Sequence, residues 1–316
     1  MASNGSPSAP SIRMLGASRW YGEILGINKI TVDIQPGITG LVGPNGSGKS
    51  TLMNLICGLM QPDQGRVFVL GEDPWNNPAL LRRLGYCTQS DKFYENFTGG
   101  QFMESILRLH GNGEAWARRT AAAGLERLNL ADAAHKKIRT YSKGMRQRVK
   151  VALALAHEPE VLVLDEPFNG LDPVGRRELI RLFVEYGREG RTVLVSSHVL
   201  HEIEQMTDRI LMMSNGYVMA EGAVREVRDQ LRSHPFRVLV RCDDSRRLAA
   251  RLLEEPHVRG VEVDDRSLTI VTVDPDSLYL RLNELVLDED FQPDLVTLAD
   301  ENVSSIFNYL AGREHH

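Results

Sequence analysis

The stretch that decides the fold is Gly43-Pro44-Asn45-Gly46-Ser47-Gly48-Lys49-Ser50-Thr51. An apolar run, Ile38–Val42, precedes it, and the mainly apolar Leu52–Ile56 follows it, so the sequence predicts a strand, a glycine-rich loop and a helix. The spacing fits the phosphate-binding pattern G-x-x-x-x-G-K-[ST]. We therefore expect a nucleotide phosphate to bind where this loop meets the helix.

Each residue type in the loop suits phosphate chemistry. Gly46 and Gly48 let the backbone bend so that successive N–H groups point at a phosphate, and the helix adds the positive end of its dipole. Lys49 can reach the β- and γ-phosphates as a point charge, and the hydroxyl of Ser50 suits Mg²⁺. A glycine-rich turn that arose by chance is the alternative, but the strand before it and the helix after it argue against that.

The composition bounds the class of protein. The chain has 316 residues, enough for two domains, and its 42% hydrophobic and 25% charged content is ordinary for a soluble globular protein. A net charge of −5 gives no sign of a nucleic-acid partner. No apolar run reaches the roughly 20 residues that span a bilayer. The three cysteines are scattered without metal-ligand spacing, which favours a reducing compartment over a disulfide framework.

Residue patterns divide the chain into a disordered lead-in, residues 1–10, and two folded regions. Strand patterns, then helical periodicity over about 90–157, then alternating strands and helices predict an α/β domain over 11–223 with an all-helical insertion. Over 224–316 the order β-α-β-β-α-β, followed by a helix at 300–310, predicts a small ferredoxin-like α+β domain.

Polar residues follow two strands that we expect to be buried. Asp165 ends the apolar run Val161–Leu164, where its carboxylate can hold the shell of a Mg²⁺ ion. Glu166 beside it can polarise a water for attack on the γ-phosphate, and a plain surface turn fits poorly because adjacent acids repel each other and attract a cation. His198 follows the strand 192–196. Because ligands bind at the carboxyl ends of parallel strands, we expect His198 near Asp165 and the phosphate loop.

Three further segments allow both a structural and a functional interpretation. Ser142, in Tyr141-Ser-Lys-Gly-Met145, is a natural N-cap, but the helix that it begins can also offer donors to a phosphate. Asp172 follows Asn169-Gly-Leu as a capping aspartate before the next predicted helix. Tyr21 precedes a glycine, and its ring can be an ordinary strand aromatic or can stack on a flat base.

Taken together, the ordered motifs from about Ile12 to Gly222 resemble the nucleotide-binding subunit of an ATP-binding-cassette (ABC) transporter. The resemblance implies a P-loop NTPase fold with an antiparallel β subdomain beside the helical insertion. It implies ATP and Mg²⁺ as ligands and ATP hydrolysis as the activity. The phosphate loop is similar to the Walker A motif, whose implied nucleotide ligands are Gly43, Asn45, Gly46, Ser47, Gly48, Lys49, Ser50 and Thr51.

The resemblance also assigns roles outside this loop. Asp165 is similar to the Walker B acid, Glu166 to the catalytic glutamate and His198 to the switch histidine. Gln89 looks like the Q-loop glutamine, which implies a catalytic role and a place with Ser50 and Asp165 among the metal ligands.

The remaining carried-over positions concern the base and a second copy of the chain. Tyr21 falls where the adenine-stacking aromatic does, and Asp172 lies in the segment that looks like the D-loop. Ser142 and Gly144 retain two positions of the LSGGQ signature, although Tyr141-Ser-Lys-Gly-Met145 departs from it elsewhere. Such variants, and the carboxy-terminal extension, are similar to those of drug, antibiotic and lipid exporter ATPases.

The resemblance implies two protein partners. One is a second copy of this chain, arranged head to tail so that each ATP lies between one copy's Walker A loop and the other's signature. The other is a transmembrane permease subunit, which places the chain at the cytoplasmic face of the cell membrane. We expect Asp91–Phe97 to dock on this subunit, and the alternative is a solvated loop with a local aromatic core.

Two competing functions are weaker. A soluble ABC-type ATPase acting on nucleic acid or ribosomes should carry a coiled-coil insertion, tandem cassettes or a basic arm, and the sequence has none of these. A small-molecule phosphotransferase would need neither the signature segment nor Glu166. The sequence therefore favours transport, and the resemblance favours export.

Overall fold

The computed structural model describes residues 9–224, 236–289 and 291–298. The chain divides between Glu221 and Gly222 into two compact units, which we describe separately. Most of the predicted lead-in, residues 1–8, and the predicted helix at 300–310 lie outside the described residues.

An antiparallel sheet opens the first unit. Its central strand, β1 (Ile12–Tyr21), pairs with β2 (Ile24–Ile34) and β4 (Gln64–Val69). The first two strands are longer than the alternating runs Ile12–Leu15 and Ile30–Ile34, which are all that the sequence pattern predicts of them. The register of β1 shifts around Gly16, where φ is +60°, and such a bulge breaks the period-two alternation on which the prediction depends.

A six-stranded sheet forms the centre of this unit, in the order β5-β6-β7-β3-β8-β9. Its strands are β3 (Gly37–Val42), β5 (Leu84–Cys87), β6 (Val161–Leu164), β7 (Thr192–Ser197), β8 (Arg209–Ser214) and β9 (Tyr217–Ala223). The first five in spatial order are parallel neighbours, and every residue of β6 and β7 is buried. The carboxyl ends of β3, β6 and β7 therefore meet at one edge of the sheet.

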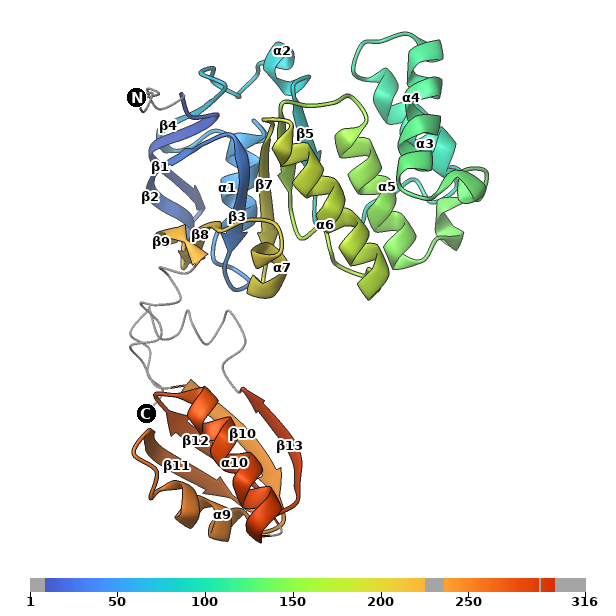
Figure 1. Ribbon diagram of the computed structural model, residues 1–316. Helices are drawn as coiled ribbons and strands as arrows, with labels where there is room; N and C mark the ends of the chain where they lie inside the picture. Colours follow the sequence, from blue (N-terminus) through green and yellow to red (C-terminus); the bar gives the residue numbers. More distant parts are fainter. Residues whose placement is uncertain (1–8, 225–235, 290, 299–316) are drawn as a thin grey trace, which may run out of the picture. The chain divides into compact units, whose positions relative to one another are not determined.

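Helices cover both faces of this sheet. Helix α1 (Lys49–Ile56) lies between it and the antiparallel sheet, where the apolar side chains of α1 join one buried cluster with both sheets (Figure 1). On the other face lie α6 (Pro173–Arg188) and α7 (Leu200–Glu204), which pack against β3 and β7. The small residue Gly40 of β3 makes room there for Ile203, because a Cβ at this position would clash with it.

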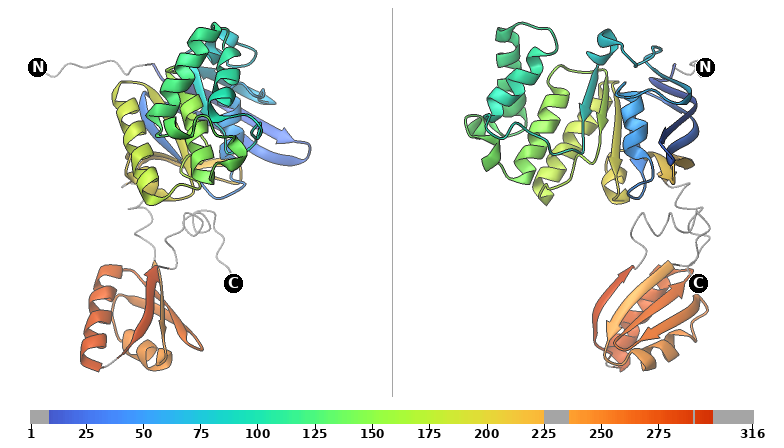
Figure 2. Two further views of the ribbon diagram at one scale, coloured as in Figure 1. Left: turned by 90° about the vertical axis from the view of Figure 1, so that its right-hand side faces the viewer. Right: turned by 180° about the vertical axis from the view of Figure 1, so that it is seen from behind.

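The helical insertion consists of α3 (Gly99–Arg108), α4 (Glu114–Arg127) and α5 (Lys143–Leu155), with two short 3-10 turns before α5. Helix α3 packs along α4, and α5 contacts both of them as well as β5. Figure 2 shows α3 and α4 side by side at the edge of the unit, beyond α5. A short helix, α2 (Pro78–Leu81), precedes β5. Helix α5 thus joins the insertion to the central sheet.

The second unit has the predicted β-α-β-β-α-β order. Its elements are β10 (Phe236–Cys242), α9 (Ser245–Leu252), β11 (Val258–Asp264), β12 (Ser267–Thr272), α10 (Pro275–Glu289) and β13 (Pro293–Leu298). The strand order is β11-β12-β10-β13 with antiparallel neighbours, and residues of both helices share one apolar core with the sheet. This arrangement is the ferredoxin-like topology that the element order predicts.

None of the helices in the described part of the chain is long and apolar enough to cross a membrane. Cys57, Cys87 and Cys242 are buried free thiols.

Candidate functional site

A cavity of about 370 Å³ lies at the edge of the sheet where β3 and β6 end. Most residues predicted to bind nucleotide line it together with three predicted catalytic or metal-binding residues. The lining residues are Tyr21, Ile24, Leu25, Gly26, Asn45, Gly46, Ser47, Gly48, Lys49, Ser50, Thr51, Gln89, Asp165 and Glu166. Gly43 lies behind the loop instead, where a Cβ would come within 2.5 Å of the carbonyl oxygen of Met213.

The phosphate loop has the backbone that its glycines predict. Gly46 and Gly48 adopt φ values of +79° and +103°, and a Cβ at Gly48 would lie 2.5 Å from the carbonyl oxygen of Gly26. The ammonium of Lys49 turns back over the loop and donates to the carbonyl oxygens of Gly43 at 2.6 Å and Pro44 at 3.1 Å. Burial lowers the pKa of Lys49, and the nearby carboxylates oppose this effect. The side-chain nitrogen of Lys49 is thus buried against the phosphate loop, where it can contact a bound phosphate.

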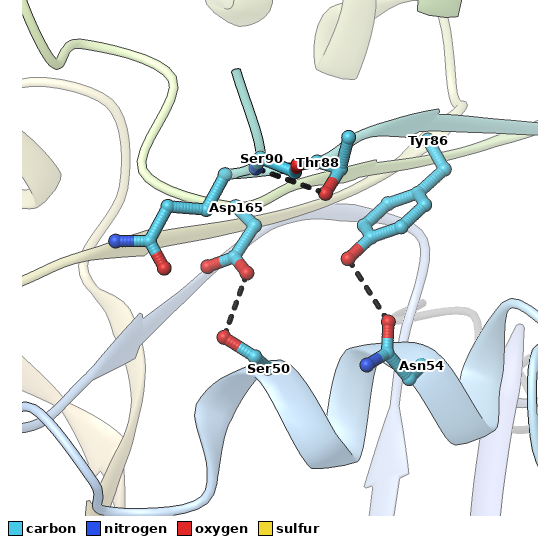
Figure 3. A pocket seen from close by; sticks show the side chains of 7 residues that line it. Ser50, Asn54, Tyr86, Thr88, Ser90 and Asp165 are labelled. Atoms are coloured by element: carbon cyan, nitrogen blue, oxygen red, sulfur yellow. Dashed lines mark hydrogen bonds between the residues drawn. The ribbon is translucent and has the colours of Figure 1, made fainter. Parts of the chain in front are cut away.

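The carboxylate of Asp165 is only 2% exposed and accepts two hydrogen bonds. Ser50 Oγ donates to Oδ2 at 2.8 Å, as Figure 3 shows, and Ser196 Oγ donates to Oδ1 at 2.8 Å. The same Ser196 oxygen accepts the backbone N–H of Glu166 at 2.8 Å. Sequence reasoning missed Ser196. The available signal was a serine at the end of a buried strand, because a buried hydroxyl needs a partner.

Glu166 and His198 form a pair beside the cavity. Glu166 is buried with a left-handed backbone, φ +50°, and its Oε2 lies 2.9 Å from His198 Nδ1. Its other carboxylate oxygen, Oε1, is buried without a hydrogen-bond partner in the described structure. A non-glycine residue held in this conformation is typical of a functional site. Glu166 therefore has one oxygen fixed by the imidazole and one left for a ligand.

A second cavity, of about 420 Å³, adjoins the first, and Ser50, Gln89 and Asp165 line both. These are the three predicted metal ligands. Figure 3 shows this second cavity, in which the Tyr86 hydroxyl donates to Asn54 Oδ1 at 3.1 Å. The described residues contain no group of three or more His, Cys, Asp and Glu side chains placed to hold a metal ion. Hydroxyl, amide and carboxylate oxygens nevertheless fit Mg²⁺, which takes few protein ligands when it also binds phosphates.

An apolar wall stands beside the phosphate loop. It consists of Tyr21 at the end of β1 and Ile24 and Leu25 at the start of β2, and Ile24 is 72% exposed. The Tyr21 hydroxyl lies 3.3 Å from Thr51 Oγ1, which ties the wall to α1. Sequence reasoning picked out Tyr21 but missed Ile24, whose signal was a large apolar residue at an exposed hairpin turn. An apolar wall next to a cationic loop fits a flat base joined to phosphates.

Ser142, Gly144 and Asp172 line neither cavity. Ser142 caps α5, its Oγ accepting the N–H of Met145 at 3.2 Å, and Asp172 caps α6, its Oδ1 accepting the N–H of Gly175 at 3.0 Å. The structural interpretation of each is therefore correct. The chain does not bring these residues to its own phosphate loop.

Two residues that depart from the LSGGQ pattern, Tyr141 and Lys143, hold the signature segment in place within the chain. Tyr141 is buried, and its hydroxyl donates to the carbonyl oxygen of Ala133 at 2.6 Å inside the helical insertion. The aliphatic part of Lys143 packs over Gly170, with its Cγ 2.5 Å from where a Cβ would be. A Cβ at Gly144 would lie 3.1 Å from the carbonyl oxygen of Gly170. The signature segment and the turn before α6 are thus in contact.

Comparison with known proteins decides the family. The profile of the ABC transporter family matches residues 27–169. A daunorubicin resistance ATP-binding protein of Streptomyces coeruleorubidus is 34% identical over 304 residues, which cover 96% of each chain. This chain belongs to the ABC transporter ATP-binding proteins. The family that the motifs predicted is confirmed.

Two more similarities extend this result. The bacitracin transport ATP-binding protein of Enterococcus faecalis is 34% identical over 258 residues, 80% of this chain and 81% of that one. The dimeric structure of an ATP-binding cassette in a post-hydrolysis state, bound to ADP and Pi, matches with a TM-score of 0.62 at 25% identity. The match covers 68% of this chain and 99% of that chain. The chain is therefore an ABC ATPase with the P-loop NTPase fold.

Replacing Ser196 with alanine tests the arrangement around Asp165. We expect Ser196→Ala to lower the free energy of unfolding by about 1–3 kcal/mol, because Asp165 Oδ1 and the Glu166 N–H both lose a buried partner. Urea denaturation measures this loss, and an ATPase assay should show a slower rate. Ser214→Ala removes a buried hydroxyl at the end of β8 in the same sheet and should cost less. Equal losses in the two variants would contradict a special role for Ser196.

Proposed function

We propose that this chain is the ATP-hydrolysing subunit of an exporter and drives transport through a separate transmembrane subunit. The observation that carries the proposal is the Glu166–His198 pair, held 2.9 Å apart beside the phosphate loop. A phosphate loop alone would fit many nucleotide-binding proteins. A buried carboxylate with an unpaired oxygen next to the same cavity adds what hydrolysis requires, a group that orients water and accepts its proton.

The proposed roles divide the site into three parts. The loop N–H groups and Lys49 bind the phosphates, and Tyr21 packs on the base. Ser50, Asp165 and Gln89 would hold Mg²⁺, which when bound neutralises charge on the β- and γ-phosphates. Glu166 Oε1 accepts the proton of the attacking water.

His198 has a part of its own in this scheme. Its Nδ1 holds Glu166 by the other oxygen, Oε2, at 2.9 Å. Its imidazole contacts the γ-phosphate. Because the same imidazole ring contacts both Glu166 and the γ-phosphate, a change in the orientation of His198 alters both contacts together.

A second copy of the chain completes the proposed site. Ser142, Gly144 and Asp172 lie outside both cavities, so they serve a nucleotide only if it is bound by another copy. The contact between Gly144 and Gly170 keeps the signature segment and the D-loop on one surface. The solved dimeric cassette bound to ADP and Pi supports the pairing of two copies, and the head-to-tail order with ATP between them is our proposal.

An aromatic cluster is the proposed contact with the membrane subunit. The rings of Phe93 and Phe102 lie 5.0 Å apart, those of Tyr94 and Phe97 5.5 Å, and Tyr94 is 63% exposed. Arg146 of α5 lies 3.8 Å from Asp91 and 3.6 Å from Glu95 of the same segment. Docking there would act on the helix that begins at the signature. This partner would hold the chain at the cytoplasmic face of the membrane.

The relatives favour transport over the soluble alternative. One is named for daunorubicin resistance and another for bacitracin transport, which supports export of small antibiotic-like molecules. No observation on the described residues favours action on nucleic acid or ribosomes.

Glu166→Gln tests the catalytic assignment. We expect ATP hydrolysis to fall by about 100-fold or more, because the amide cannot take up the proton of the water. ATP binding should remain, and ATP-bound dimers should accumulate on size-exclusion chromatography. Adding Lys49→Ala should abolish these dimers because the phosphates lose their cation. Glu160→Gln, at the opposite end of β6, is the matched control. Normal turnover of Glu166→Gln would remove Glu166 from this role.

Tyr94→Ala tests the docking surface. We expect the purified variant to hydrolyse ATP like the unchanged chain. It should bind membrane vesicles of its source organism about 10-fold more weakly, because an aromatic side chain that becomes buried in an interface often contributes strongly to binding. Co-sedimentation with the vesicles measures binding. Leu109→Ala removes another apolar side chain, 81% exposed at the end of α3, and should bind normally. Undiminished sedimentation of Tyr94→Ala would place the docking surface elsewhere.

A further inference from the structure

The last two residues of β7, Ser196 and Ser197, point their side chains to opposite faces of the sheet. Ser196 donates to Asp165, whereas the hydroxyl of Ser197 donates to Glu202 Oε2 at 2.6 Å and accepts the N–H of Val199 at 2.9 Å. Glu202 belongs to α7 and is only 5% exposed. Because side chains alternate along a strand, one strand end positions both the acid of the nucleotide site and a second buried carboxylate.

The second oxygen of Glu202 reaches a different helix. Its Oε1 lies 2.9 Å from Arg176 Nη1, and Arg176 belongs to α6. The Arg176 backbone N–H donates to the carbonyl oxygen of Asp172 at 3.0 Å, so this arginine lies one turn after the D-loop aspartate. A continuous set of contacts therefore runs from Asp172 through Arg176 and Glu202 to Ser197, the residue before His198.

The turn between β7 and α7 does not require a charged side chain at position 202. A neutral acceptor would satisfy the hydroxyl of Ser197, and a buried carboxylate is costly unless it is paired with a cation. Arg176 supplies that cation from another element. The pair thus fixes the segment that carries His198 relative to the start of α6.

We propose that Glu202 is a positioning residue for hydrolysis, which holds His198 against Glu166 and couples that contact to the start of α6. This inference rests on the proposed function, since it needs His198 and Glu166 to act on ATP. A partner copy that contacts the turn at Asp172 displaces Arg176 with α6. The ion pair passes the displacement to Glu202 and Ser197, and so to the imidazole 2.9 Å from Glu166 Oε2.

Glu202→Gln is the direct test. The amide keeps the size of the side chain and an acceptor for Ser197 but loses the charge that faces Arg176. We expect kcat to fall by about 10-fold or more at an ATP KM changed by less than about two-fold, because orientation is lost while binding is kept. Nitrogen-15 NMR of the histidines in the full chain should show a changed tautomer or shift for His198, assigned by His198→Gln.

A matched control separates positioning from general loss of an ion pair. Glu160 at the start of β6 pairs with Arg83 at 2.6 Å, at the opposite end of the sheet from the site. Glu160→Gln should leave kcat and the His198 signal unchanged. A purely structural role for Glu202 would lower the melting temperature but leave the kcat of the folded protein and the His198 signal in place.

Substitutions at Arg176 keep the proposal testable if Glu202→Gln does not fold. Arg176→Met should lower kcat as Glu202→Gln does, and Arg176→Lys should restore part of it because a cation is again present. The double variant should be no slower than either single variant, since residues that act as one unit are not additive.

Three results would overturn the proposal: unchanged kcat in Arg176→Met, additive losses in the double variant, or an unchanged His198 signal. Absence of ATP hydrolysis by the unaltered chain would instead overturn the proposed function.

Discussion

The carboxylate of Asp165 is buried, and Ser50 and Ser196 each donate a hydrogen bond to it at 2.8 Å. Burying a carboxylate without such partners would cost several kcal/mol, because even a neutral polar group costs on the order of 2–7 kcal/mol when it is buried without a hydrogen bond. The two donors come from α1 and β7, and the acid itself follows β6. Satisfying one charge therefore fixes the ends of three elements, and the site is assembled by the fold itself.

The end of β7 extends this constraint in two directions. On one side Ser196 also accepts the N–H of Glu166, which holds that residue in its left-handed conformation. On the other side Ser197 engages the buried carboxylate of Glu202. The hydrogen bonds of the Glu166 N–H to Ser196 and of its carboxylate to His198 help to keep Glu166 in this uncommon conformation. His198 follows directly, so the geometry of the proposed reaction depends on how this one strand ends.

The positions of the phosphate loop, Asp165, Glu166 and His198 after their strands were predictable because the local sequence determines where each strand ends. A fixed spacing, glycines where the backbone needs positive φ, and acids at the ends of apolar runs all act over a few residues. The ferredoxin-like second unit was predictable for the same reason, since its element order is visible in the hydrophobic pattern.

What the sequence did not reveal depends on contacts between distant segments. Ser196 and Asp165 are 31 positions apart, and nothing local shows that their side chains meet. The link from Glu202 to Arg176 is equally non-local. The full length of β1 and β2 was missed because the alternation is interrupted at Gly16 in β1 and at Lys29 in β2, where the backbone has positive φ. The sequence shows only that the signature segment departs from LSGGQ, whereas the structure shows that Tyr141 anchors this segment through a buried hydrogen bond to the carbonyl oxygen of Ala133.

The head-to-tail arrangement is tested most directly by mixing two variants that are inactive alone, Lys49→Ala and Ser142→Ala. In a mixed dimer of this geometry, one site joins the intact phosphate loop of one copy to the intact serine of the other. ATP hydrolysis should therefore reappear when the two proteins are mixed, and it should be absent from either one alone. A mixture as inactive as its components, or full activity of Ser142→Ala by itself, would contradict a site shared between two copies.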